Sequence, residues 1–184
     1  MIAAAGHEVV DLRDAGVPES AAEDELEVGA TFDENALAKA KYFARITGMA
    51  TLADDSGLEV EALGGAPGVL SKRWSGRSDL SGQALDDANN QRLLARLDGL
   101  ENRAARYVCA AACSGAGPDR VERGETAGSI TKSPSGSGGF GYDPYFLSTE
   151  LGRTFGSVSM EEKARVSHRA RAFAKLLRHI AEQR

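Results

Sequence analysis

The sequence predicts an α/β fold in which a mixed, twisted sheet is flanked by helices. Three observations lead to this fold class: helical segments opened by capping boxes, short apolar segments typical of strands, and glycine clusters that separate them. A chain of 184 residues has the length of one domain and can bury a hydrophobic core. We therefore expect residues 1–184 to form a single domain, with room for two lobes around a cleft.

Three segments carry helical periodicity. The first begins at the capping box Thr31-Phe32-Asp33-Glu34 and ends at Gly48, with small or apolar residues recurring in between. The second covers Ala84 to Leu97, with its leucines on the buried side. The third is the long C-terminal region, in which Ser159 to Glu162 repeats the capping-box spacing.

Four shorter apolar segments are predicted to be strands: Ala50–Ala53, Arg106–Ser114, Val121–Thr131 and Tyr142–Ser148. Cys109 and Cys113 lie in the second of them, and their spacing puts both thiols on one face of a strand. The sequence has no other cysteine and only three histidines. We expect buried, reduced thiols here rather than a structural zinc site.

The composition argues against a nucleic-acid-binding protein and against a membrane protein. The net charge is −5 and the isoelectric point is near 5.3, whereas binding to nucleic-acid polymers usually needs a basic face. No apolar run approaches the length of a membrane span, and the N-terminus lacks the basic start of a secretory signal. A cytoplasmic location is the default expectation.

The segment Asp54-Asp55-Ser56-Gly57 is the first candidate site, and we expect it where the strand at residues 50–53 ends. Consecutive strand residues point to opposite faces, so only one aspartate can enter a given cleft, and Asp55 is the candidate because it adjoins the predicted turn. A carboxylate there is well placed to hold Mg²⁺, which prefers oxygen ligands. The alternative is an ordinary turn in which Asp and Ser side chains satisfy backbone groups.

An acidic segment precedes the first predicted helix, at residues 23–29, and its simplest interpretation is a solvated loop. Glu34 has its own role as the third residue of the capping box. Lys39 lies one turn beyond Asn35 and could reach a phosphate group from the same helix face. Otherwise Lys39 is an ordinary solvent-exposed lysine.

The glycine-rich segment from Gly138 to Pro144 is the third candidate. Its glycines let the backbone approach a ligand, Phe140 offers a stacking face for a base, and Asp143 offers acceptors for a ring N–H. The alternative is a glycine-rich hairpin whose aromatic side chains fill the core.

The fourth candidate comprises Lys163, His168 and Arg169. On one unbroken helix these residues would not share a face, because neighbours on a face recur at three or four residues. If the helix breaks near Ser167, all three could converge on one anionic ligand. If it does not, their charge forms a solvated face.

Taken together, these segments resemble the inosine triphosphate pyrophosphatase family, in its bacterial XTP/dITP diphosphatase branch. The resemblance runs in order through Gly29–Ala36, Ala53–Leu58, Leu63–Gly68, Gly138–Pro144, Glu162-Lys163 and Ser167–Arg169, and so spans nearly the whole chain. It implies an α/β fold of two lobes around a nucleotide cleft, a usual homodimer, and hydrolysis of XTP, ITP or dITP to the monophosphate and pyrophosphate with Mg²⁺.

The resemblance also implies roles for individual residues. Asp55 would be the catalytic acid–base residue and a metal ligand, and Glu27 the second metal ligand. The implied substrate-binding residues are Ser56, Phe140, Gly141, Tyr142, Asp143, Lys163, His168 and Arg169, with Lys39 and Arg73 as weaker candidates for phosphate contact. Because a guanidinium offers donors only, Arg169 would pair with a 6-oxo group and leave adenine's 6-amino group unmatched, at a cost of about 1–3 kcal/mol.

The chain departs from the family in one respect. The family opens with a strand and a Thr/Ser-x-Asn-x-x-Lys loop that grips the triphosphate, and the sequence contains no such motif. Residues 1–10 resemble instead the end of the family's first helix followed by its second strand. We expect this chain as written to be catalytically impaired and rescued by an upstream segment. The alternatives are a non-catalytic nucleotide-binding protein and a pyrophosphatase of the septum-inhibitor type.

Overall fold

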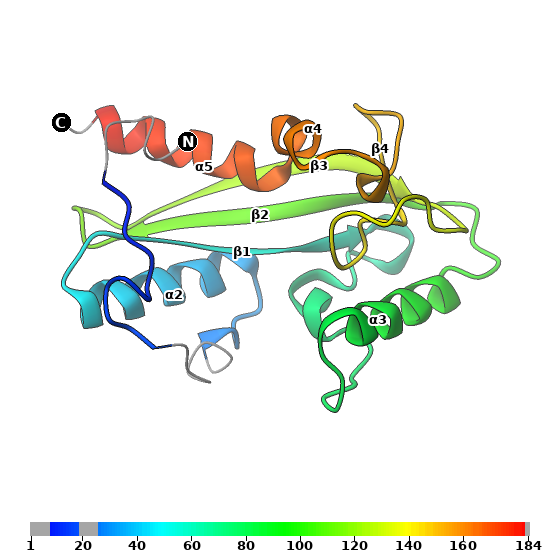
Figure 1. Cartoon of the computed structure of the whole chain (residues 1–184), viewed down its shortest axis with the longest axis horizontal. Coiled ribbons are helices and arrows are strands. Elements are labelled where there is room, and N and C mark those ends of the chain that lie inside the picture. Colours follow the sequence, from blue (N-terminus) through cyan, green and yellow to red (C-terminus); the bar gives the residue numbers. More distant parts are fainter. Residues whose placement is uncertain (1–7, 19–25, 183–184) are drawn as a thin grey trace. The chain divides into compact units, whose positions relative to one another are not determined.

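The α/β fold class is confirmed by a computed structural model, which describes residues 8–18 and 26–182. Four strands form one sheet in the order β1-β2-β3-β4. The elements are α2 (Phe32–Thr47), β1 (Thr51–Val60), the 3-10 helices η2 (Glu61–Leu63) and η3 (Gly68–Arg73), α3 (Gly82–Arg96), β2 (Ala104–Ser114), β3 (Arg120–Ile130), β4 (Phe146–Ser148), the 3-10 helix η4 (Phe155–Ser157), α4 (Met160–Val166) and α5 (His168–Glu182) (Figure 1).

The chain divides into two compact units. Unit 1 comprises Met1–Asp55, Cys109–Gly124 and Arg169–Arg184, and unit 2 comprises Ser56–Val108 and Glu125–His168. The divisions fall inside β1, β2 and β3, so each of these strands contributes residues to both units. The single domain expected for residues 1–184 stays a prediction.

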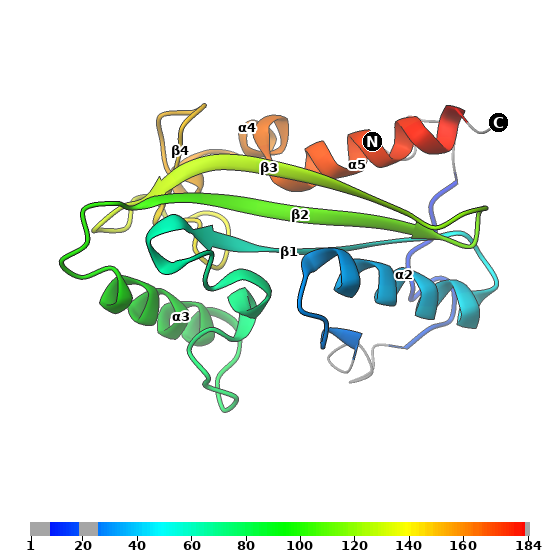
Figure 2. The same cartoon turned by 180° about the vertical axis from the view of Figure 1, so that it is seen from behind.

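In unit 1, α2 and α5 lie on opposite sides of the strands, as Figures 1 and 2 both show. Alternate residues of β2, Cys109, Ala111 and Cys113, pack against Ala172 and Leu176 of α5. Both cysteines are buried, and neither forms a disulfide. The prediction of reduced thiols on one buried strand face is therefore confirmed.

Unit 2 is built around a larger core in which aromatic rings pack together. The ring centroids of Tyr107 and Phe146 are 4.6 Å apart, and those of Phe146 and Phe155 are 5.0 Å apart. Leu93 and Leu97, at the end of α3, are fully buried in the same cluster. The helix predicted over residues 84–97 is thus confirmed, with its leucine face in the core.

Two predicted strand limits were wrong. β1 does not end before the acidic segment: the strand is ten residues long and includes Asp54 and Asp55. The last strand is only three residues long and pairs antiparallel with β3, placing Phe146 opposite Ile130, whereas residues 142–145 form a turn. Pro144 in that segment and Gly141 before it favour a turn over a strand.

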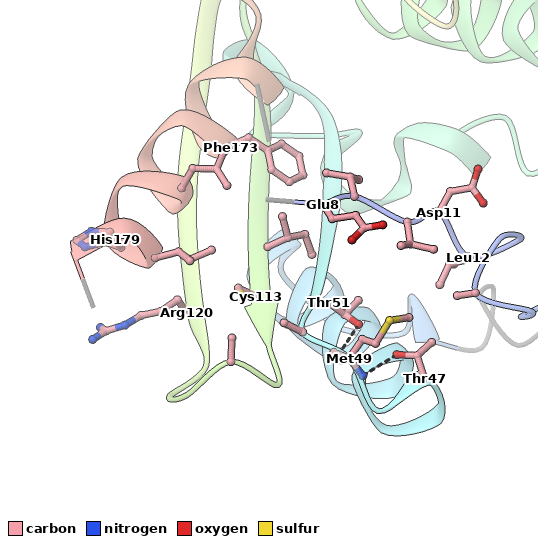
Figure 3. Close-up of a pocket in the computed structure, with 18 of the residues that line it drawn as sticks. Glu8, Asp11, Leu12, Thr47, Met49, Thr51, Cys113, Arg120, Phe173 and His179 are labelled. Carbon is pink, nitrogen blue, oxygen red and sulfur yellow. Dashed lines mark hydrogen bonds between the residues drawn. The ribbon is translucent and has the colours of Figure 1, made fainter. Parts of the chain in front are cut away.

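An apolar pocket of about 620 Å³ lies within unit 1 (Figure 3). Its lining includes Leu12, Met49, Cys113 and Phe173, and it contains none of the predicted site residues. The strand expected within the first ten residues falls partly on residues 1–7, outside the described part of the chain; residues 8–10 form no strand. Among the described helices, none is long and apolar enough to cross a membrane.

Candidate functional site

The strand β1 sends its two aspartates to different partners. Asp54 Oδ2 accepts hydrogen bonds from Arg169 Nε of α5 at 3.0 Å and from Cys109 Sγ at 3.6 Å. Asp55 instead accepts from two residues of α2, Asn35 and Lys39. Because α2 and α5 lie on opposite sides of the strands, this is the alternation expected of an unbroken strand. The expected turn beside Asp55 was wrong, but the choice of one aspartate per face was right.

Lys39 joins Asp55 to Glu27. Its Nζ lies 2.8 Å from Glu27 Oε1 and 3.4 Å from Asp55 Oδ1, and all three side chains are largely shielded from solvent. Asn35 completes the arrangement, since its Nδ2 donates to Asp55 Oδ2 at 2.9 Å while its Oδ1 accepts from Gly29 N at 2.7 Å. The structure therefore brings together three residues predicted for the site, Glu27, Lys39 and Asp55.

Burial and neighbouring charges shift the pKa values of both Asp55 and Lys39. Burial raises the pKa of Asp55, and the nearby charge of Glu27 adds to the rise, although Asn35 and Lys39 oppose it. Burial pulls the pKa of Lys39 down, but its hydrogen bond to Glu27 and the charges of both carboxylates outweigh this, so its pKa is raised. Lys39 is thus firmly cationic, and Asp55 is a carboxylate that takes up a proton more readily than usual.

The geometry of the cluster suits a cation. One ammonium nitrogen lies within 3.4 Å of both carboxylates, so Glu27 and Asp55 are close enough to share a positive centre. Carboxylate oxygens are the ligands that Mg²⁺ prefers, and Mg²⁺ usually takes only one or two of them together with water and phosphate oxygens. The described residues contain no group of three or more His, Cys, Asp or Glu side chains arranged around a metal site. Two carboxylates remain a sufficient donor set for this ion.

In unit 2, Asp143 organises the glycine-rich segment. The residue is only 1% exposed, and its carboxylate accepts from Phe140 N at 3.0 Å and from Tyr107 Oη at 3.3 Å and forms an ion pair with Lys163. Burial and the charge of Asp143 raise the pKa of Tyr107 well above its usual range, which keeps that hydroxyl a donor. Gly139, at φ 74°, sits so close to Asp143 that any Cβ would collide with the carboxylate.

Phe140 presents an exposed aromatic ring. The residue is 65% exposed, and Lys163 Nζ lies 4.9 Å from the centroid of its ring. An exposed ring beside a fixed ammonium group can stack on a heterocycle and attract an anionic one. Phe140 is therefore the accessible member of this group, while the Lys163 side chain is only 12% exposed and is held by the buried Asp143.

Of the other residues predicted for the site, two are buried among core side chains, one is half-buried and one is exposed. Tyr142 is buried in the core of unit 2, and its hydroxyl donates to Ser71 O at 2.8 Å. The His168 ring is buried and stacks on Tyr107 at 4.8 Å. Ser56 is half-buried in β1, and Arg73 is exposed at the end of η3.

The helix break predicted near Ser167 is confirmed. α4 ends at Val166, Ser167 adopts an extended ψ of 144°, and α5 begins at His168. Lys163 and His168 belong to unit 2, whereas Arg169 belongs to unit 1 and is paired with Asp54. Their convergence on one ligand stays a prediction.

The comparisons with known proteins identify the family. The sequence profile of the Ham1 family matches residues 1–179. The chain belongs to the Ham1 family. It is 48% identical over 175 residues to a dITP/XTP pyrophosphatase of Syntrophobacter fumaroxidans, covering 94% of this chain and 71% of that protein.

Solved Ham1 structures share the fold. A HAM1 protein from Coxiella burnetii is 33% identical with a TM-score of 0.81, covering 95% of this chain and 86% of that one. The Staphylococcus aureus Ham1 protein is 37% identical with a TM-score of 0.78, covering 86% of this chain and 80% of that one. These matches confirm both the resemblance and the fold class drawn from the sequence.

Sequence reasoning missed several polar residues, Asn35 and Asp54 in unit 1 and Asp86, Asn90 and Tyr107 in unit 2. Asn35 carried a usable signal. Asn35 lies on the helix stripe of Phe32, Ala36 and Phe43, and a polar residue on an apolar stripe needs a buried partner. Tyr107 carried no such signal, because an aromatic residue in a buried strand is ordinary.

Proposed function

We propose that this chain hydrolyses non-standard purine nucleoside triphosphates, namely XTP, ITP and dITP, to the monophosphate and pyrophosphate. The observation that carries the proposal is the buried Asp55, whose pKa is raised and which shares Lys39 with a second carboxylate, Glu27. Perturbed carboxylates of this kind are typical of catalytic sites. The relatives named dITP/XTP pyrophosphatase support the choice of reaction and of substrate class.

Asp55 accepts a proton from the water that attacks the α-phosphorus, and pyrophosphate is the leaving group. A carboxylate whose pKa is raised by burial is a stronger base than an ordinary one. The hydrogen bond from Asn35 fixes one oxygen and so orients the other. Lys39, cationic throughout the physiological range, attracts the triphosphate.

Asp55 and Glu27 hold Mg²⁺ in this proposal. The ion, when bound, neutralises charge on the phosphate oxygens and lowers the cost of bringing a polyanion to two carboxylates. Lys39 now pairs with both carboxylates, so it exchanges these partners for phosphate oxygens when substrate and ion bind.

Base recognition falls to Phe140 with Lys163, and to Arg169. The Phe140 ring stacks on the purine, and Lys163, fixed by Asp143, stands next to it. Arg169 offers donors to a 6-oxo group, which inosine and xanthine have and adenine lacks. The backbone of Gly141 and the residues Ser56, Tyr142, His168 and Arg73 complete the proposed contacts.

The test is pyrophosphate release from ITP, XTP and dITP, with ATP and GTP as the comparison, in Mg²⁺ and in EDTA. We expect Mg²⁺-dependent release that favours the three non-standard substrates over ATP by at least about 10-fold, which corresponds to one mismatched buried polar group. Equal rates with ATP would contradict the proposal, and so would an absence of release both from this chain and from the chain preceded by a segment that carries the family's Thr/Ser-x-Asn-x-x-Lys loop.

A homodimer and a cytoplasmic location also belong to the proposal, as do a nucleotide partner and the absence of nucleic-acid or membrane binding. Light scattering behind size exclusion tests the first: we expect twice the mass of the 19.4 kDa chain. Cell fractionation tests the second.

A further inference from the structure

We infer that Asp86 and Asn90 of α3 are positioning residues, which clamp the backbone of Gly141 and thereby set the ring of Phe140 for a purine base. The inference rests on the proposed function, and it adds two residues that make no contact with the base themselves. Both residues, and the segment they hold, lie within unit 2.

The clamp forms hydrogen bonds with both the N–H and the carbonyl group of Gly141. Asp86 Oδ2 accepts the Gly141 N–H at 2.7 Å, and Asn90 Nδ2 donates to the Gly141 carbonyl at 2.9 Å. Asp86 and Asn90 are four residues apart on α3, so they share a face of the helix. Gly141 itself has φ 60°, a left-handed conformation that favours glycine.

The position of this glycine is what gives the clamp its effect. The Gly141 N–H belongs to the peptide that follows Phe140, so fixing it fixes the backbone angle ψ of Phe140. Asp143 holds the other side of the same residue by accepting from Phe140 N at 3.0 Å. With the backbone held on both sides, the Cα–Cβ bond of a side chain that is 65% exposed keeps one direction, which limits the positions that the ring can take.

The chemistry of Asn90 argues for a role beyond packing. Its position continues the stripe of Leu93 and Leu97 toward the start of α3, where an apolar side chain would be ordinary. Asn90 is buried instead, and its Oδ1 has no hydrogen-bond partner among the described residues. Its Nδ2 donates both to Gly141 O and to Asp86 O of the preceding helical turn, so the amide links α3 to the glycine even though its Oδ1 is left unsatisfied.

The experiment compares Asp86→Ala with Asp87→Ala, which removes the same group from the next position of the same helix. Asp87 is exposed and bonded to Gln83, outside the clamp. We expect Asp86→Ala to raise KM for ITP by about 10-fold, the equivalent of one hydrogen bond, with kcat changed by no more than about 3-fold. Asp86→Asn, which keeps an acceptor oxygen, should restore KM, and Asp87→Ala should match the parent.

Hydrogen exchange over residues 138–143 provides the second readout, which does not depend on catalysis. Faster exchange there in Asp86→Ala alone supports the clamp. Equal KM and equal exchange in the two alanine variants would overturn it, and so would an equal fall in kcat and kcat/KM accompanied by general loss of stability. A parent chain that hydrolyses no triphosphate, either alone or preceded by the family's phosphate-binding segment, defeats the proposed function, and the exchange pattern then decides whether α3 positions this segment.

Discussion

Burial raises the pKa of Asp55 despite the hydrogen bonds from Asn35 and Lys39, so the native state binds a proton here more readily than the unfolded chain does. The stability that this protonation contributes is fully present below the ordinary pKa of 3.8 and is lost as pH rises through the native value. At neutral pH the charged carboxylate therefore opposes folding. The residue that we assign to catalysis is one that the fold holds at a cost.

Asp55→Asn should separate activity from stability. We expect hydrolysis to fall by at least about 100-fold, the contribution of a general base, because the amide keeps the shape and loses the charge. The urea midpoint should rise at pH 7, measured in EDTA, and this gain should disappear near pH 4. Asp87→Asn is the control and should change neither quantity. A variant of Asp55 that retains full activity would remove the assignment.

Lys39 should matter more for stability than its neighbour on the same helix, Lys41. Lys39→Gln leaves Glu27 and Asp55 facing each other in a shielded place, at an expected cost of about 1–3 kcal/mol in urea unfolding at pH 7. Lys41 pairs with Asp119 on the surface, so Lys41→Gln should cost between about 0 and 1 kcal/mol. Because the pKa of Lys39 is raised, its contribution should persist at neutral pH and fade only in strongly alkaline solution. Equal losses in the two variants would contradict this account.

At the scale of elements, helix starts could be predicted well because they depend on local chemistry. Thr31 and Ser159 each cap their helix through reciprocal bonds with the residue three positions on, as the sequence indicated. The end of β1 could not be predicted, because an acidic segment reads as a turn unless its partners are known. Arg169, which is 115 positions beyond Asp54, and Asn35, 20 positions before Asp55, keep those carboxylates in the strand.

The same reasoning explains which part of the site was predicted. Lys39 and Asp55 carry charge beside a helix start and a glycine, so their residue types suggested chemistry, whereas Glu27 was indicated only by the resemblance to the family. Asp86 and Asn90 act only through the backbone of a glycine 51 to 55 positions away, and such a partner depends on the tertiary fold.

Thr31→Ala tests the element-level account. Losing the cap should cost about 1 kcal/mol, within a range of about 0.5–2, because the Glu34 N–H loses its acceptor. Urea unfolding measures the loss, and Thr31→Ser, which keeps the hydroxyl, should recover most of it. A loss of zero would mean that water replaces the cap fully.

At the scale of the whole molecule, three strands run through both compact units, so we expect unfolding to be cooperative. The only tryptophan, Trp74, lies in unit 2, whereas Leu176 is buried in unit 1. Leu176→Ala should destabilise the protein by about 2–5 kcal/mol as followed by Trp74 fluorescence. A fluorescence midpoint that stays in place while circular dichroism shows an earlier transition would show that the units unfold separately.

The two buried thiols on one face of β2 can report, through their reaction with an alkylating reagent, how often β2 separates from α5 in unit 1. Cys113, 6% exposed, lines the apolar pocket, whereas Cys109 is fully enclosed. Burial and the charge of Asp119 raise the pKa of Cys113, so even this thiol reacts slowly at neutral pH. A small alkylating reagent should therefore label Cys113 first, at a rate set by thiolate formation, and Cys109 only as often as the strand separates from α5. The rate at which Cys109 is alkylated after Cys113 therefore measures, without any substitution in the chain, how frequently β2 and α5 separate.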